Sequence, residues 1–387
     1  MRIREHVATV TCLLVLAAAS VHFYRQPIYS MDMAGYMGNA LLMGERDVDR
    51  VHDRVYAEMR REIPPEAFAA LTGSGGPADQ NESRRARLEH AENFAQFLPF
   101  FAIRPLYNIA IYFLGKVVGV IPAIRLITAL PYFLMGVLTF WWMSRYVPKF
   151  MAAAAAVLVM LTPPMMWIGR DTGSDALATL AAFLALYLIF EKERDAFGLG
   201  LIMASLWIRT DNIVLLGPVL LVCWRQRRFE LWKGAVLGLV ALASVLAINH
   251  YGGDYGIKML YYRNFVGVPV APAEMTVTFS LRQYVSAFAA GLRAMVESYT
   301  TLVALLGIAG WWLSRKARPL IAVSTASVAL HFIILPNWQE RWFGVFYLSM
   351  GIALVAALGA GFGGRESRVL VMRRNDDAEG PPAVHVR

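Results

Sequence analysis

The chain of 387 residues is 57% apolar or aromatic and carries a formal net charge of +9. Together with a mean hydropathy of +0.47, this composition is typical of an integral membrane protein and argues against a soluble domain. The basic residues gather between apolar runs, where they act as topology signals, so the charge does not indicate a nucleic acid partner. Walker, H-E-x-x-H and paired C-x-x-C motifs are absent from the sequence, which argues against nucleotide hydrolysis and the familiar zinc sites.

The first apolar run covers residues 6–24 and follows a basic start that contains Arg2 and Arg4. This start resembles a signal peptide, but the run is long enough to span a bilayer and no A-x-A-like cleavage site follows promptly. We therefore expect a retained first membrane span. Cys12 and Cys223 both lie within apolar runs, where a thiol behaves as a small apolar side chain, so a structural disulfide is not expected.

The apolar runs as a whole predict an all-α, polytopic membrane helix bundle of about ten spans. Basic clusters between the runs place both termini in the cytoplasm, because cytoplasmic loops are enriched in Lys and Arg. The predicted spans cover residues 6–24, 123–143, 151–168, 174–190, 197–209, 212–223, 233–250, 296–313, 319–335 and 342–361. Residues 1–365 would form this transmembrane domain, and residues 366–387 a disordered cytoplasmic tail. We expect a bacterial inner membrane, with the opposite face of the bundle toward the periplasm.

Two large loops are predicted on the periplasmic face, at residues 25–122 and 251–295. In the first loop, Val48, Val51, Val55 and Met59 recur at spacings of three and four, which predicts an amphipathic helix lying on the outer leaflet. The apolar segment 104–122 has both ends outside in this topology. We therefore expect it to be a re-entrant or juxtamembrane helix instead of a further span.

Acidic and basic residues, which are costly near membrane spans, recur at the outer turns. Asp32 follows the first span, and the turn before the fourth span holds Arg170, Asp171 and Asp175. The spans 197–209 and 212–223 contain only about a dozen residues each, so the turn between them should dip below the outer surface and line a cavity. That turn contributes Arg209 and Asp211, the loop 251–295 contributes Lys258 and Arg263, and Arg341 precedes the last span.

Each of these residues also has a purely structural interpretation. Acids such as Asp171 and Asp175 can cap the helix that they precede, and Asp32 can do the same after the first span. Arg209 and Asp211 can form an internal ion pair that makes a short hairpin tolerable. The remaining basic side chains can anchor the membrane interface.

Four segments resemble the GT-C superfamily, integral membrane glycosyltransferases that use polyprenyl-phosphate-linked sugars. The segments are SMDMAGYM around Asp32, RPLYN from Arg104, GRDTGSDALATL from Gly169, and WIRTDN around Arg209. Protein O-mannosyltransferases and lipid A aminoarabinose transferases show similar layouts. The resemblance implies a catalytic acid at Asp32 and a second acid at Asp171 or Asp175. The family commonly has an acid pair where this sequence has Asp32 alone, so a bound Mn²⁺ or Mg²⁺ stays an open alternative.

Sugar transfer from a phosphate carrier needs a base for the acceptor hydroxyl and cations for the leaving phosphate. We expect Asp32 to be the base. The expected substrate-binding set is Arg104, Arg170, Asp171, Asp175, Arg209, Asp211, Lys258, Arg263 and Arg341. The acceptor, a lipid, glycan or protein, stays open. Two other classes also stay open: a transporter or flippase, for which mid-membrane charges and inverted repeats are typical, and a non-catalytic envelope assembly protein.

Overall fold

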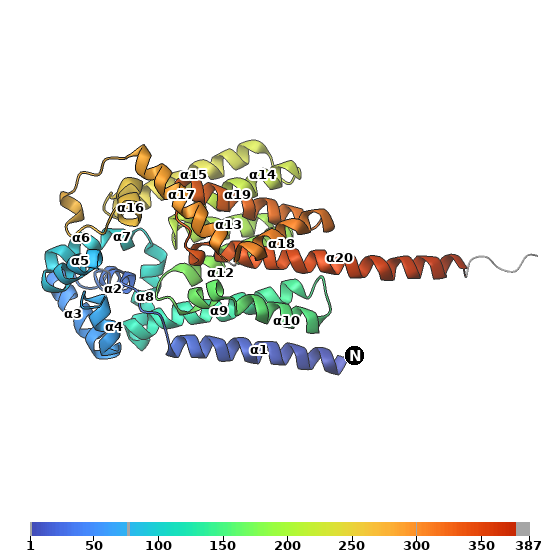
Figure 1. Ribbon diagram of the computed structural model, residues 1–387, viewed down its shortest axis with the longest axis horizontal. Helices are drawn as coiled ribbons and strands as arrows, with labels where there is room; N and C mark the ends of the chain where they lie inside the picture. The colour runs from blue at the N-terminus through green and yellow to red at the C-terminus, as the bar shows by residue number, and fades with distance from the viewer. Residues whose placement is uncertain (1, 76–77, 299, 377–387) are drawn as a thin grey trace, which may run out of the picture.

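The computed structural model describes residues 2–75, 78–298 and 300–376, which are helical and contain no β-strand. Long helices run along the long axis of the molecule, and a group of shorter helices covers one end of them (Figure 1). The long bundle consists of α1 (Arg2–Arg25), α9 (Val120–Met143), α10 (Lys149–Met160), α11 (Pro163–Arg170), α12 (Asp175–Phe190), α13 (Asp195–Leu206), α14 (Ile213–Arg225), α15 (Leu231–Tyr251), α18 (Thr300–Leu313), α19 (Arg318–Ile334) and α20 (Gly344–Asp376).

Among the described residues, four stretches of helix are long and apolar enough to cross a membrane on their own: Ile3–Arg25, Val120–Met143, Leu231–Tyr251 and Glu340–Ala360. Two bent helix pairs raise the number to six if each pair is one span. Several apolar helices thus indicate a membrane protein, as the composition predicts. The described residues do not confirm ten spans, because α12, α13 and α19 and the apolar part of α18 have only 10–17 residues each.

The bent pairs lie where proline interrupts an apolar run. The predicted span 151–168 is two helices, α10 and α11, that meet at an angle of 67°. Pro163 and Pro164 begin α11, and proline lacks the N–H that would continue the helix before it. The other pair joins Ala91–Ala102 to Pro105–Val118 at 112°. The segment 104–122 is therefore a helix that turns sharply at its start and ends at Gly119, where a φ of 93° favours glycine.

Residues 25–122 form a compact helical unit, which we call the outer unit. Its helices are α2 (Asp32–Leu41), α3 (Val48–Glu62), α4 (Pro65–Leu71), α5 (Ala78–Glu89), α6 (Ala91–Phe97), α7 (Pro99–Ala102) and α8 (Pro105–Val118). The predicted amphipathic helix is α3, and Asp47 caps it by accepting hydrogen bonds from the N–H groups of Asp49 and Arg50.

The prediction that α3 lies on the outer leaflet is wrong. Val51, Val55 and Met59 are at most 1% exposed and belong to a core that also contains Met37 and Phe94. The apolar face of α3 packs against α2 and α6 and not against lipid. The periodicity of α3 indicates that one face of the helix is buried. In this protein the other helices of the outer unit cover that face.

The second large loop folds over the outer unit. It contains α16 (Gly256–Phe265), the short helix η2 (Pro272–Glu274) and α17 (Leu281–Glu297). The Tyr255 hydroxyl donates to the backbone oxygen of Gln96 at 2.5 Å, and the Gln96 side chain accepts from the Ala273 N–H at 3.2 Å. These bonds bring two loops together that lie far apart in the sequence.

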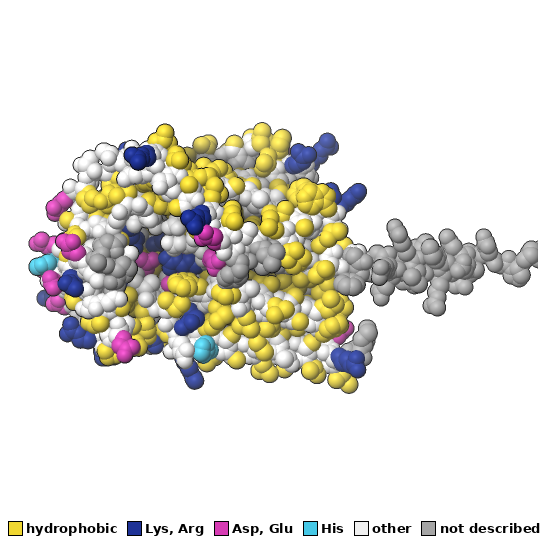
Figure 2. Space-filling model, in the orientation of Figure 1, with side chains coloured by type: hydrophobic (Ala, Val, Ile, Leu, Met, Phe, Trp, Pro, Cys, Tyr) yellow, Lys and Arg dark blue, Asp and Glu magenta, His cyan; other side chains and the backbone are white. Residues whose placement is uncertain are grey.

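Charge is unevenly distributed along the molecule. A belt of hydrophobic side chains separates an end with mixed acidic and basic residues from an end with mainly basic ones (Figure 2). The turns after α9, α12 and α14 carry the basic clusters. The helix α20 continues to Asp376, so residues 366–376 are helical where we expected a disordered tail, and residues 377–387 lie outside the described residues.

Candidate active site

A polar cavity of about 380 Å³ lies where the outer unit meets the bundle. Its walls come from α2, the start of α8, the turn between α11 and α12, the short helix η1 (Thr210–Asn212), α16 and the short helix η3 (Glu340–Phe343). The predicted site residues that line it are Asp32, Arg104, Asp171, Asp175, Arg209, Asp211, Arg263 and Arg341. Topology thus brings most of the predicted set to one place, which we call the polar cavity.

Two predicted residues are not in this cavity. The Arg170 side chain donates to the backbone oxygen of Gln26 at 3.0 Å and does not line the polar cavity. Lys258 is exposed on α16 and precedes Arg263 by five residues on the same helix. Arg170 and Lys258 therefore lie outside the cavity that the other predicted residues line, and their place in the substrate-binding set stays a prediction.

Asp32 begins α2 and binds Arg263 of the second large loop. Oδ1 of Asp32 accepts from Nη2 of Arg263 at 3.0 Å, and both side chains are 21% exposed. The guanidinium of Arg263 also lies over the rings of Phe100 and Phe101, at 4.8 and 5.1 Å. Burial raises the pKa of Asp32, but the charges of Arg263, Arg341 and Arg104 outweigh it, so this pKa lies below its ordinary value. Asp32 is therefore a carboxylate that still faces the cavity.

The turn 171–175 is tied to the chain that leads into α2. Ile28 donates to the Arg170 oxygen at 2.8 Å, and Thr172 donates back to the Ile28 oxygen at 3.2 Å. This short bridge between Ile28 and Asp171 holds the turn beside the start of α2. Two acids that are distant in the sequence, Asp32 and Asp171, line one cavity as a result.

Asp171 and Asp175 bind arginines instead of capping α12. Nη1 of Arg341 donates to Oδ2 of Asp171 at 2.9 Å, and Nε of Arg341 lies 3.7 Å from Oδ2 of Asp175. The residue in the capping position is Ser174, and it makes no side-chain cap. Burial raises the pKa of Asp171 to about 6 against the opposing charge of Arg341, and the negative charge of Asp32 adds to the rise.

Arg209 holds two acids together. Its Nε and Nη2 donate to the two oxygens of Asp211 at 2.9 and 2.5 Å, and its Nη1 bonds to Asp175. This fork-to-fork pairing is the internal ion pair that makes a polar turn tolerable beside apolar helices. Burial would raise the pKa of Asp211, but Arg209, helped by His331, lowers it to about 2. Arg209 is engaged mainly with carboxylates, so it positions them.

Arg104 differs from the other arginines of the polar cavity. It donates to the backbone oxygen of Phe100 at 3.3 Å and lies 5.4 Å from the ring centre of Tyr36. No carboxylate lies within ion-pair distance of it in the part of the chain that the structure describes. Its positive charge is therefore available to an anionic ligand.

A second cavity, of about 690 Å³, adjoins the first. Met31, Asp171, Gln339 and Arg341 line both cavities. The rest of its wall includes Ala70, Leu71, Pro163 and Trp167, with Tyr29, Ser30 and Arg84. Trp167 is 49% exposed on the apolar helix α11, and we call this mainly apolar cavity the side cavity.

The sequence pattern did not identify two further residues at or near the polar cavity. Tyr36 lines the polar cavity and is buried; it lies four residues after Asp32, a spacing that places both on one helix face. His331 lies in the apolar helix α19 near Asp211. A histidine within a membrane helix is a signal that could have identified it.

The donor set does not fit a divalent metal. Asp32, Asp171, Asp175 and Asp211 each bind an arginine, and the described residues hold no group of three or more His, Cys, Asp or Glu side chains placed to share an ion. Hard divalent ions need several oxygen ligands at once. We therefore assign no step to Mn²⁺ or Mg²⁺.

Neither protein-family models, nor curated proteins, nor solved structures gave a match to this chain. The resemblance to the GT-C superfamily stays a prediction from the residues quoted above.

Proposed function

We propose that this protein is an integral membrane glycosyltransferase that moves a sugar from a polyprenyl-phosphate carrier to an acceptor at the periplasmic face. The observation that carries the proposal is the pair of adjoining cavities, one polar and one mainly apolar, which share Asp171 and Arg341. A lipid-linked sugar has the same division, with an apolar chain, an anionic phosphate and a polar head. The basic turns at the opposite end of the bundle support the periplasmic orientation.

In this proposal the polyprenyl chain lies in the side cavity along Trp167 and Leu71, and the phosphate lies beside Arg341. Arg104 completes the phosphate site, because its guanidinium has no carboxylate partner in the described structure. A guanidinium matches phosphate oxygens bidentately. The sugar then lies in the polar cavity near Asp32.

Asp32 is the proposed general base. Arg263 holds one of its oxygens, which leaves the other for the acceptor hydroxyl, and its lowered pKa keeps it ionised at neutral pH. The base takes the hydroxyl proton as that oxygen bonds to the sugar carbon, while the bond from this carbon to the phosphate oxygen breaks. The leaving phosphate carries the electron pair away and is stabilised by arginine charge.

The direct test is to incubate the purified protein with labelled polyprenyl-phosphate sugars and membrane extracts and to identify the products by mass spectrometry. A new glycoside that depends on the protein supports the proposal. Movement of the carrier across reconstituted vesicles with no glycoside formed would instead identify a flippase. If the protein neither forms a glycoside nor moves the carrier, the result would favour the non-catalytic assembly protein.

A further inference from the structure

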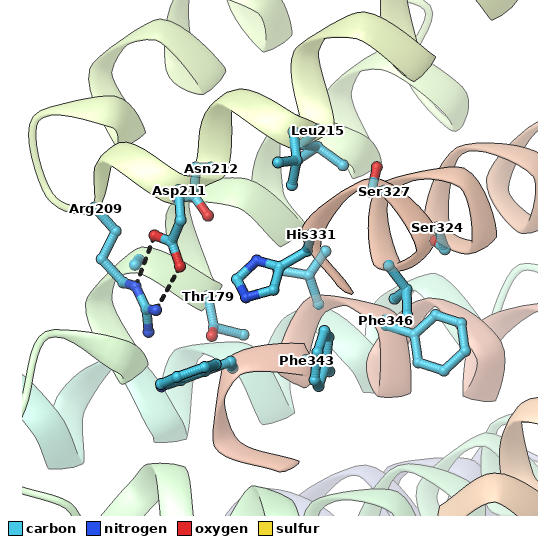
Figure 3. A pocket seen from close by; sticks show the side chains of 15 residues that line it. Thr179, Arg209, Asp211, Asn212, Leu215, Ser324, Ser327, His331, Phe343 and Phe346 are labelled. Carbon is cyan, nitrogen blue, oxygen red and sulfur yellow. Dashed lines mark hydrogen bonds and ion pairs between the residues drawn. The ribbon is translucent and has the colours of Figure 1, made fainter. Parts of the chain in front are cut away.

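A small pocket adjoins the active site, and its mainly apolar lining carries a group of buried polar atoms. It has a volume of about 60 Å³ and is bounded by α12, the turn from η1 to α14, α19 and the start of α20. Arg209, Asp211 and Trp342 line both this pocket and the polar cavity. The Arg209–Asp211 ion pair therefore borders both spaces, and Figure 3 shows it in the wall of this pocket. We call this space the rear pocket.

The polar lining of the rear pocket comes largely from one face of α19. Ser324, Ser327 and His331 follow one another at spacings of three and four, which places them on the same side of a helix. All three are buried, at 2%, 8% and 7% exposure. Figure 3 shows His331 reaching from this helix toward Asp211. The polar stripe extends about 10 Å along a helix that is mostly apolar.

Four polar atoms around the rear pocket have no hydrogen-bond partner among the described residues. They are Oγ of Ser324, Oγ of Ser327, Nε2 of His331 and Nδ2 of Asn212. Buried polar groups are nearly always hydrogen-bonded, and water is the usual partner where protein is not. Because one water needs about 10–15 Å³ of such space, a pocket of about 60 Å³ has room for several.

The imidazole of His331 is held in a fixed position. Its ring centre lies 5.7 Å from that of Trp342 and 5.3 Å from that of Phe343. These rings keep the unpartnered nitrogen in the pocket and close to the Asp211 carboxylate, which Arg209 binds from the other side.

We propose that the rear pocket is a water-binding site, with His331 as its central ligand, that hydrates the Arg209–Asp211 pair on the side away from the polar cavity. Bound waters satisfy the two serine hydroxyls, the imidazole and the Asn212 amide together. They also stabilise the charge of Asp211 beside the apolar helices. This site does not depend on sugar transfer, and its test needs no substrate.

The first test measures deuterium exchange at the imidazole Cε1–H by mass spectrometry on the purified protein in lipid nanodiscs. His52 is the matched control: it is 8% exposed, and its ring nitrogens bond to Asp53 and to the backbone oxygens of Arg87 and Leu88. The two histidines are about equally buried, but of the two only His331 lines the rear pocket. We expect His331 to exchange several-fold faster than His52. Exchange as slow as that of His52 would overturn the proposal.

The second test uses the sign of a change in melting temperature. If waters bind the Ser327 hydroxyl, Ser327→Ala removes a hydrogen bond and lowers the Tm by about 2–4 °C. If the pocket is dry, the same change removes an unsatisfied hydroxyl and raises the Tm. Ser349→Ala is the matched control, because Ser349 Oγ is also buried and unpartnered among the described residues but does not line the pocket. A rise for Ser327→Ala equal to that for Ser349→Ala would overturn the proposal.

Discussion

Nη1 of Arg341 donates to Oδ2 of Asp171 at 2.9 Å and thereby joins residues 170 positions apart in the sequence. The pair lies at the boundary between the polar cavity and the side cavity, and both of its members line both spaces. Any ligand that occupies the two cavities at once must pass this pair. At this pair the protein can therefore bind the charged group and the apolar chain of one ligand at the same time.

Asp32→Asn tests the proposed base. Asn keeps the size of the side chain and an oxygen that can accept from Arg263, but it cannot take a proton. We expect turnover to fall by about 10²-fold or more, which corresponds to about 2.7 kcal/mol of barrier. Donor binding and the melting temperature should change little. Near-wild-type turnover from a well-folded variant would remove Asp32 from the reaction.

Arg104→Gln tests the free guanidinium. Because Arg104 has a backbone oxygen but no carboxylate as its partner in the described structure, its loss should leave the fold intact and weaken binding of the phosphate-linked donor by about 10-fold or more. Binding of a labelled polyprenyl-phosphate sugar measures the effect. Arg170→Gln, which changes an arginine outside both cavities, is the control and should bind normally. An equal loss in the two variants would show a general effect of outer-face charge.

Arg209→Lys should affect stability. A single ammonium cannot bond to both oxygens of Asp211 and to Asp175 as the guanidinium does, so a buried carboxylate loses its partner. Breaking such a pair costs about 3–5 kcal/mol, and the retained charge reduces this to about half. Thermal unfolding in detergent measures the change. Arg145→Lys is the control, because Arg145 pairs with Glu191 at a site where it is 59% exposed and should cost little.

The raised pKa of Asp171 predicts a pH effect on stability. Because its pKa is about 6 in the folded protein and 3.8 ordinarily, the folded state binds this proton more tightly than the unfolded chain. The stabilisation is complete below about pH 4 and is lost as the pH rises through about 6. Asp211, with its pKa lowered to about 2, acts in the opposite direction and only below about pH 4. Asp171→Asn should remove the decline between pH 4 and 6, and melting curves that stay parallel to wild type would contradict the assignment.

Topology is tested with single cysteines. The native Cys12 and Cys223 are buried and should not react with a membrane-impermeant maleimide. Glu89→Cys, at the exposed end of α5, should be labelled in spheroplasts, whereas Arg227→Cys, in the exposed turn after α14, should react only after the membrane is opened. Labelling of both from the same side would refute the orientation.

Hydrophobic patterns predicted where helices form but not what covers them. The predicted spans lie mostly in helices among the described residues, and the runs 6–24, 123–143 and 233–250 match single long helices. The run 296–313, in contrast, extends over the end of α17 and over α18. The face made by Val51, Val55 and Met59 is apolar in either setting, so its spacing cannot distinguish a lipid surface from the core that α2 and α6 provide. The shorter runs do not reveal whether a helix crosses alone or together with a bent neighbour.

The sequence predicted most of the charged residues that line the polar cavity, but not how their side chains pair. Topology alone gathers Asp32, Asp171 and Arg341 on one face, because alternate loops share a side of the membrane. Topology does not determine the direction of a side chain. For this reason Arg263 lines the polar cavity and Lys258 does not, although the two residues are five positions apart on α16. The pairing of Arg209 with two acids depends on how the turn is folded, so the sequence left its two interpretations open.

The pairing of Asp32 with Arg263 also has a consequence for biosynthesis. The two residues are 231 positions apart, so a ribosome completes the outer unit long before α16 exists. Until α16 has been translated, the Asp32 carboxylate lacks its ion-pair partner, and of the three arginines whose charges lower its pKa only Arg104 has been made. A chain that stops before α16 would thus carry Asp32 without that partner. The Asp32–Arg263 pair forms only after most of the chain has been made.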